Sequence, residues 1–223
     1  MLGRPRLHLR ETSSTNDRAR ELAGTGAPHG TLVTAAAQSA GRGRQGRTWS
    51  APPGHALLMS LVLRDPPPLL PLGAAVAVAA AAGDDARIKW PNDVLVDGRK
   101  VSGILAEGRP QEGWAVLGVG VNVTTERFPV ELAESATSLR LAGSAATPAQ
   151  VLADLLESLS RWLSAPPERV LETWRSLDAL KGERVRWTGG EGIADGIDDS
   201  GALRVETGSG LVTLDAGEVH LLR

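Results

Sequence analysis

The chain has 223 residues, enough for one domain of ordinary size and a small second one, so a hydrophobic core can form without metals or disulfides. It contains no cysteine, which excludes disulfide scaffolds, cysteine zinc sites and a cysteine nucleophile, and which fits a reducing compartment. The 24 basic and 26 acidic residues nearly balance, which argues against a protein that neutralises a nucleic-acid backbone. Only Lys89, Lys100 and Lys181 are lysines among these bases, so each lysine is a candidate for a specific role.

Hydrophobic spacing predicts a helix over residues 15–23, strands over 31–37 and 56–63, a helix over 72–82, strands over 94–96, 101–106 and 114–121, and helices over 148–163 and 168–177. Asp97-Gly98 is a hairpin signal. Residues 185–223 alternate in short runs broken by glycines, which predicts a β module of about five strands. We therefore divide the chain into a domain of residues 1–180 and a β domain of residues 181–223.

No segment is typical of a membrane span or a secretion signal. The first residues have no apolar signal core. The most apolar stretch, residues 69–82, is interrupted by Pro71 and Gly73 and falls short of the ~20 residues of a bilayer crossing. We expect a cytoplasmic protein that does not contact a membrane.

The first candidate site is the glycine-rich run from Gly41 to Arg47, preceded by Gln38 and followed by Trp49. Its glycines let the backbone approach a ligand closely, and its clustered arginines favour a bound phosphate or carboxylate. It is not a P-loop, because no Gly-Lys-Ser/Thr follows. A solvated basic turn and a contact to RNA remain open on these residues alone.

The second candidate is the pentapeptide from Lys89 to Asp93, which closes one predicted strand and opens the next. It offers a cation, an amide and a carboxylate where a small polar ligand could be held, although the same residues also make a good turn. Lys100 stands before the following strand, and Gly103 within that strand is typical of close approach by a ligand or another backbone.

Two further motifs are weaker. Ser13, Ser14, Thr15 and Asn16 could simply cap a helix, or could present hydroxyls and N–H groups to an amide or carboxylate. The run from Gly118 to Asn122 resembles half of a dinucleotide fingerprint, but its third glycine is missing and no helix follows, so we do not expect a Rossmann site. The four histidines lack metal-ligand spacing.

The order of these motifs is far more specific than any one of them. Ser-Ser-Thr-Asn, Gln-x-x-Gly-Arg-Gly-Arg-x-Gly-Arg-x-Trp, Lys-Trp-Pro-Asn-Asp, Arg-Lys-x-x-Gly-Ile-Leu and Gly-x-Gly-x-Asn follow one another along the chain. In this order the sequence closely resembles the biotin protein ligases. The resemblance implies an α+β fold, in which a mixed β-sheet flanked by helices, as in the biotin and lipoate ligases, precedes a small C-terminal SH3-like β-barrel.

The resemblance also implies roles for individual residues. The residues that would hold biotin are Ser14, Thr15, Asn16, Gln38, Arg42, Gly43, Arg44, Lys100 and Gly103. The nucleotide side of the site would comprise Arg44, Arg47, Trp49, Lys89, Asn92 and Asn122. The catalytic group would comprise Arg44, Lys89, Asp93 and Lys100, with Asp93 helping the acceptor lysine to lose its proton.

The implied reaction joins biotin and ATP into biotinyl-5'-AMP and then transfers biotin to a lysine of the biotin carboxyl carrier domain of a carboxylase. Mg²⁺ would shield the departing pyrophosphate, although the sequence identifies no metal ligand. Only about a dozen residues precede the Ser-Ser-Thr-Asn segment, so we expect no DNA-binding domain and no DNA partner. A monomer and a weak homodimer both remain open.

Two other functions remain as alternatives. A lipoate or octanoate transferase belongs to the same superfamily, but the arginine-glycine-histidine signature usual in those enzymes is missing and there is no cysteine. A non-catalytic RNA-binding module would use the run from Gly41 to Arg47.

Overall fold

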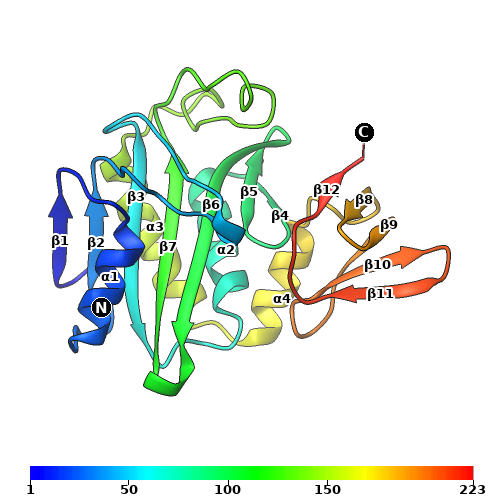
Figure 1. Cartoon of the computed structure of the whole chain (residues 1–223), viewed down its shortest axis with the longest axis horizontal. Coiled ribbons are helices and arrows are strands. Elements are labelled where there is room, and N and C mark those ends of the chain that lie inside the picture. The colour runs from blue at the N-terminus through cyan, green and yellow to red at the C-terminus, as the bar shows by residue number, and fades with distance from the viewer. Residues whose placement is uncertain (223) are drawn as a thin grey trace.

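The computed structural model describes residues 1–222 and is built on a seven-stranded mixed sheet (Figure 1). The strand order is β1-β2-β3-β7-β6-β5-β4. The strands are β1 (Arg6–Leu9), β2 (Leu32–Ala35), β3 (Ala56–Arg64), β4 (Arg87–Lys89), β5 (Asp93–Val96), β6 (Arg99–Arg109) and β7 (Trp114–Asn122). β1 pairs with β2 in parallel and all other neighbours are antiparallel, so the predicted mixed sheet is confirmed.

Helices cover both faces of this sheet. α1 (Thr15–Gly24) lies on one face, which we call the α1 face, and α2 (Leu70–Ala82), α3 (Pro148–Trp162) and α4 (Pro167–Ser176) lie toward the other (Figure 1). The strands alternate accordingly, because successive side chains point to opposite faces. Val62 packs with α1, whereas its neighbours Leu61 and Leu63 pack with the three other helices. α2 is buried along most of its length, as its apolar, alanine-rich sequence predicts.

Residues 184–221, which we call the C-terminal module, form an antiparallel sheet of five strands in the order β11-β10-β9-β8-β12. The strands are β8 (Arg184–Trp187), β9 (Gly190–Ile197), β10 (Leu203–Thr207), β11 (Gly210–Leu214) and β12 (His220–Leu221). Val185 and Leu203 of the module share one hydrophobic cluster with Trp174 of α4. The five predicted strands are therefore confirmed, while the closed SH3-like barrel and the division at residue 180 stay predictions.

Some elements differ from the sequence-based expectation. β1 was not predicted, β4 was predicted only as the strand that the pentapeptide from Lys89 to Asp93 closes, and β6 continues to Arg109 although its apolar pattern ends at Ala106. The predicted hairpin is present, since Asp97 and Gly98 both have positive φ angles of 51° and 71° and connect β5 to β6.

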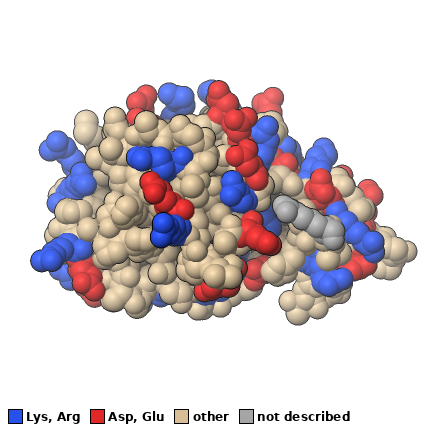
Figure 2. All heavy atoms as spheres, turned by 90° about the horizontal axis from the view of Figure 1, so that it is seen from above, with Lys and Arg blue, Asp and Glu red and all other residues tan. Residues whose placement is uncertain are grey.

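Acidic and basic side chains are interspersed over the face in Figure 2. Within residues 1–222, every helix is too short or too polar to cross a membrane.

Candidate active site

All of the site residues that the sequence nominated line a single cavity of about 620 Å³ on the α1 face, which we call the inner cavity. They are Ser14, Thr15, Asn16, Gln38, Arg42, Gly43, Arg44, Arg47, Trp49, Lys89, Asn92, Asp93, Lys100, Gly103 and Asn122. They come from the start of α1 and its N-cap, from the glycine-rich loop (residues 41–47) with the flanking Gln38 and Trp49, and from the strands β4 to β7 with Asn92 between β4 and β5. Segments up to about a hundred residues apart in sequence therefore meet at one place.

A hydrogen-bond network of neutral side chains forms one end of the inner cavity, at the start of α1. Gln38 Oε1 accepts hydrogen bonds from the backbone N–H of Thr15 at 2.7 Å and from its hydroxyl at 3.0 Å. Ser60 Oγ lies 2.8 Å from Thr15 Oγ1 and 2.6 Å from Asn16 Oδ1. Ser14 occupies the N-cap position, but its side chain makes no capping hydrogen bond. Its buried hydroxyl can therefore bind a ligand.

The sheet forms a flat floor under the ring of Trp49. Gly103 of β6 and Gly120 of β7 are paired across the two strands. A Cβ atom added at Gly103 would lie 3.0 Å from Trp49 Cζ3, and one added at Gly120 would lie 2.5 Å from Cε2. Gly118 makes room for Asn16 in the same way, at 2.1 Å from Oδ1. The glycines of the Gly-x-Gly run thus serve close packing rather than a dinucleotide.

Cations gather at the other end of the inner cavity. Lys100 Nζ forms an ion pair of 2.7 Å with Asp93 Oδ1 and lies 5.7 Å from the centre of the Trp49 ring. Burial lowers the pKa of the Lys89 ammonium, and the carboxylates of Asp93 and Glu218 oppose that shift. Burial also lowers the pKa of Arg44, which nevertheless stays charged at physiological pH.

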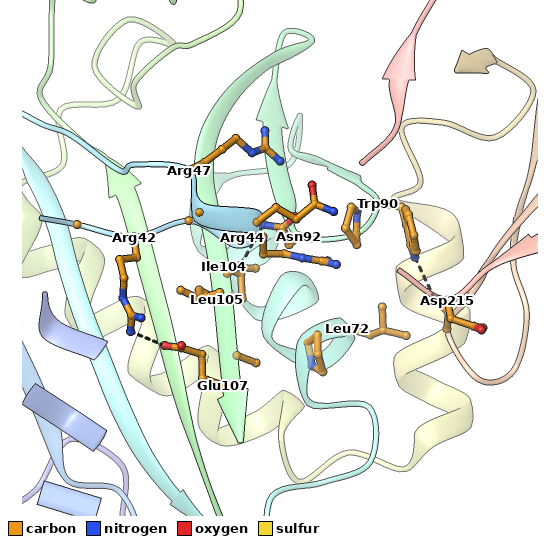
Figure 3. Close-up of a pocket in the computed structure, with 18 of the residues that line it drawn as sticks. Arg42, Arg44, Arg47, Leu72, Trp90, Asn92, Ile104, Leu105, Glu107 and Asp215 are labelled. Carbon is orange, nitrogen blue, oxygen red and sulfur yellow. Dashed lines mark hydrogen bonds and ion pairs between the residues drawn. The ribbon is translucent and has the colours of Figure 1, made fainter. Parts of the chain in front are cut away.

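The glycine-rich loop separates the inner cavity from a larger one of about 1040 Å³, which we call the outer cavity (Figure 3). Arg42, Arg44 and Arg47 border both cavities. Figure 3 shows Arg42 turned onto Glu107, at 3.0 Å, and Arg47 leaving the loop in another direction. Arg47 Nη1 pairs with Glu218 Oε1 at 2.6 Å. No carboxylate among the described residues forms an ion pair with Arg44, so this cation can meet a ligand anion.

Two nominated asparagines also have structural tasks. Asn92 donates a hydrogen bond from Nδ2 to Ile104 O at 3.0 Å, and Asn122 donates to Thr137 O at 3.1 Å. Asn122 thereby ties the segment after β7 to the sheet. Their side-chain carbonyl oxygens are the atoms left to contact a ligand.

The sequence reasoning missed several cavity residues. Glu218, His220 and Leu221 reach the inner cavity from the C-terminal module, and Ser135 and Ala136 reach it from the segment after β7. The backbone of this segment pairs with Lys100 on both sides, through Lys100 N to Ser135 O at 2.7 Å and Thr137 N to Lys100 O at 2.8 Å. No local motif marks these residues, because only the docking of distant segments brings them to the site.

The fold and the cavity together define an enzyme-like site with neutral hydrogen-bonding side chains at one end and cations at the other. The model of the biotin/lipoate A/B protein ligase family matches residues 9–123, and that of the biotin protein ligase C terminal domain matches residues 180–222. The chain belongs to the biotin/lipoate A/B protein ligase family.

Named relatives resemble the chain over nearly its whole length. It is 38% identical over 232 residues to the bifunctional ligase/repressor BirA of Bacillus subtilis, which covers 94% of this chain and 71% of the relative. It is 37% identical over 237 residues to the biotin--[acetyl-CoA-carboxylase] ligase of Mycobacterium tuberculosis, covering 96% of this chain and 87% of the relative. The biotin protein ligase of Aquifex aeolicus in complex with biotin and ATP superposes with a TM-score of 0.84 at 29% identity and covers 99% of both chains.

Proposed function

We propose that this chain is an ATP-dependent biotin protein ligase, which activates biotin as biotinyl-5'-AMP and transfers it to a lysine of the biotin carboxyl carrier domain of a carboxylase. The observation that carries the proposal is the inner cavity, in which the complete ordered motif set of the sequence comes together. The relatives named as biotin ligases, from Mycobacterium tuberculosis and Aquifex aeolicus, support the substrate assignment over the lipoate and octanoate alternatives.

Biotin has a neutral ureido ring and a negatively charged carboxylate tail, and the inner cavity offers both kinds of partner. The hydroxyls and amides of Ser14, Thr15, Asn16 and Gln38 suit the ureido ring, because they donate and accept hydrogen bonds without charge. We assign the ureido ring to this end of the cavity. The backbone of β6 at Gly103 then lies beside the bound biotin. The carboxylate then points toward Lys100 and Arg44.

The first chemical step joins two anions. The biotin carboxylate attacks the α-phosphorus of ATP, and pyrophosphate leaves as the new acyl–phosphate bond forms. Lys100 and Arg44 reduce the repulsion between carboxylate and phosphate and stabilise the charge that develops on the phosphoryl oxygens. Lys89 and Arg47 bind the phosphates, and the ring of Trp49 with the amides of Asn92 and Asn122 binds the rest of the nucleotide. The buried Nε1 of Trp49, which finds no acceptor among residues 1–222, supports a ligand there.

The second step transfers the acyl group to the carrier lysine. The neutral amine of that lysine attacks the acyl carbon of biotinyl-5'-AMP and AMP leaves, while Asp93 accepts the proton of the amine. Arg42 and Gly43 belong to the glycine-rich loop, which covers the mixed anhydride and keeps water away until the carrier arrives. No covalent bond to the enzyme is needed.

Mg²⁺ belongs with the nucleotide in this proposal. No cluster of three or more acidic or histidine side chains suited to a metal occurs among the described residues. The cavity therefore fits a cation held mainly by the triphosphate of ATP, which is the usual mode for Mg²⁺ and which shields the charge of the pyrophosphate when bound. A cytoplasmic location and the absence of a DNA partner stay predictions, and the proposal is compatible with a monomer and with a weak homodimer.

The direct test is to incubate the protein with a biotin carboxyl carrier domain, biotin and Mg-ATP and to measure the mass of the carrier. We expect one added biotin on a single lysine, and no addition when ATP is left out. Octanoate or lipoate in place of biotin should add nothing. Modification by lipoate but not by biotin would overturn the proposal, and so would tight binding of RNA with no binding of biotin in calorimetric titrations.

A further inference from the structure

Glu107, on the cavity face of β6, carries no motif and no assigned role, yet it connects two parts of the site. Because strand side chains alternate, Glu107 lies on the same face of β6 as Gly103 and Leu105, and its hydrogen bonds show that it faces α1 and the glycine-rich loop. The Glu107 side chain is 25% exposed and lies where the two cavities approach α1. A half-buried carboxylate needs hydrogen-bond or ionic partners, and those of Glu107 belong to two different parts of the site.

The first partner is the amide of Asn16. Asn16 Nδ2 donates to Glu107 Oε2 at 2.8 Å and to Leu105 O at 3.3 Å, while Asn16 Oδ1 faces Ser60 Oγ at 2.6 Å. A carboxylate only accepts hydrogen bonds, so it selects the rotamer of the amide in which the NH₂ group points toward it. The carboxylate of Glu107, which accepts the shorter of the two Nδ2 hydrogen bonds, thereby orients Asn16 together with the Leu105 carbonyl and, through Ser60, also Thr15.

The second partner is the glycine-rich loop. Arg42 Nη2 donates to Glu107 Oε2 at 3.0 Å and pairs with Asp17 Oδ1 at 2.8 Å. Arg20 of α1 pairs with the same two carboxylates, so two cations and two anions form a closed, balanced cluster. Arg42 is thereby anchored to α1 and β6, and this end of the loop is fixed before any ligand arrives.

We infer that Glu107 is a positioning residue for the biotin half of the reaction: it orients the Asn16 amide and anchors the Arg42 end of the glycine-rich loop. The inference rests on the proposed function and goes beyond it, because Glu107 itself does not line the inner cavity. Its effect must therefore be selective. Binding of biotin depends on it, whereas the nucleotide residues at the other end of the cavity do not touch it.

Glu107→Gln tests this with almost no change of shape. The amide can no longer accept two charged donors and select the Asn16 rotamer, so we expect the KM for biotin to rise about tenfold or more, as after loss of a charged hydrogen-bond partner. The KM for ATP should stay within twofold and the melting temperature should change little. Glu191→Gln is the matched control, because Glu191 also bridges two arginines, Arg184 and Arg186, but lies in the C-terminal module and lines neither cavity.

A second pair of variants shows whether Glu107 acts through Asn16. Combined with Asn16→Ala, Glu107→Gln should raise the KM for biotin by clearly less than the product of the two single effects. If Glu107→Gln does not fold, Ser60→Ala replaces it, because this variant removes the hydrogen bond to Asn16 Oδ1 on the opposite side of the amide. We then expect Ser60→Ala to raise the KM for biotin and to leave the KM for ATP within twofold. A wild-type protein that binds no biotin would overturn the proposed function as well. A wild type that binds biotin, together with equal affinity in Glu107→Gln or equal losses for biotin and ATP, overturns the inference alone.

Discussion

Lys100 forms a close ion pair in the inner cavity, with its ammonium 2.7 Å from the carboxylate of Asp93. In the proposed reaction this ammonium stands between the biotin carboxylate and the α-phosphate, where a compact charge fits better than a planar guanidinium. Lys100→Ala should therefore slow adenylate formation about a hundredfold or more, the usual cost of removing a group that stabilises transition-state charge. Single-turnover release of pyrophosphate measures this step. Lys181→Ala is the control, and a Lys100 variant with near-normal release would contradict the assignment.

Lys89 allows a prediction about pH. Its pKa is lowered chiefly because burial disfavours the charged ammonium, so this lysine loses its proton at a lower pH than an ordinary one. The proposed phosphate contact needs the charged form. The KM for ATP should therefore rise as pH increases through the lowered pKa. Lys89→Arg should move this alkaline rise to higher pH, because the guanidinium keeps its proton. Superimposable profiles of KM against pH for the two proteins would exclude Lys89 as the titrating group.

At the scale of elements, the paired strands β6 and β7 support the nucleotide side through their glycines. A methyl group at Gly120 would lie 2.5 Å from the Trp49 ring and must displace it. We expect Gly120→Ala to raise the KM for ATP about tenfold, in line with the usual cost of overpacking. Gly24→Ala at the end of α1 is the matched control, since the added methyl would have no atom within 4 Å beyond its chain neighbours and the backbone of its own helix. Steady-state kinetics with varied ATP measure the effect. A KM for ATP within twofold of the wild-type value would show that the space above Gly120 is not needed for ATP binding.

The same strands show what a sequence can and cannot predict. Long apolar patterns such as those of β3, β7 and α2 predicted their elements, because burial on one or both faces leaves a periodic record. β1 and β4 left none, since each has three or four residues with charged or exposed positions, and only pairing with a longer neighbour defines them. The ordered motifs nominated residues that share the inner cavity. Glu107 and Glu218 were missed, because their partners lie far away in sequence.

At the scale of the whole molecule, the C-terminal module closes the site from outside the seven-stranded sheet. Trp90, within the pentapeptide from Lys89 to Asp93, donates a hydrogen bond from Nε1 to Gly201 O at 3.0 Å. The Arg47 end of the glycine-rich loop pairs with Glu218, while its Arg42 end is held by Glu107. The loop is thus fixed at one end to the catalytic sheet and at the other to the module. Any movement of the module relative to the sheet would change how the loop covers the cavity.

This arrangement predicts that Glu218→Gln lets the adenylate escape. Arg47 and Glu218 are half and one-third exposed, so their pair adds little to stability, but it holds the loop closed over the mixed anhydride. We expect biotinyl-5'-AMP to dissociate about twofold to fivefold faster, which corresponds to the worth of an exposed ion pair. Labelling of bystander lysines in the absence of carrier measures the escape. Asp199→Asn is the matched control, because Asp199 also pairs the module with the rest of the chain, through Arg175 at 2.8 Å, but away from the cavity. Added salt screens exposed charges, so it should speed escape from the wild type and leave Glu218→Gln unchanged. Equal sensitivity to salt in both proteins would show that this pair does not hold the loop.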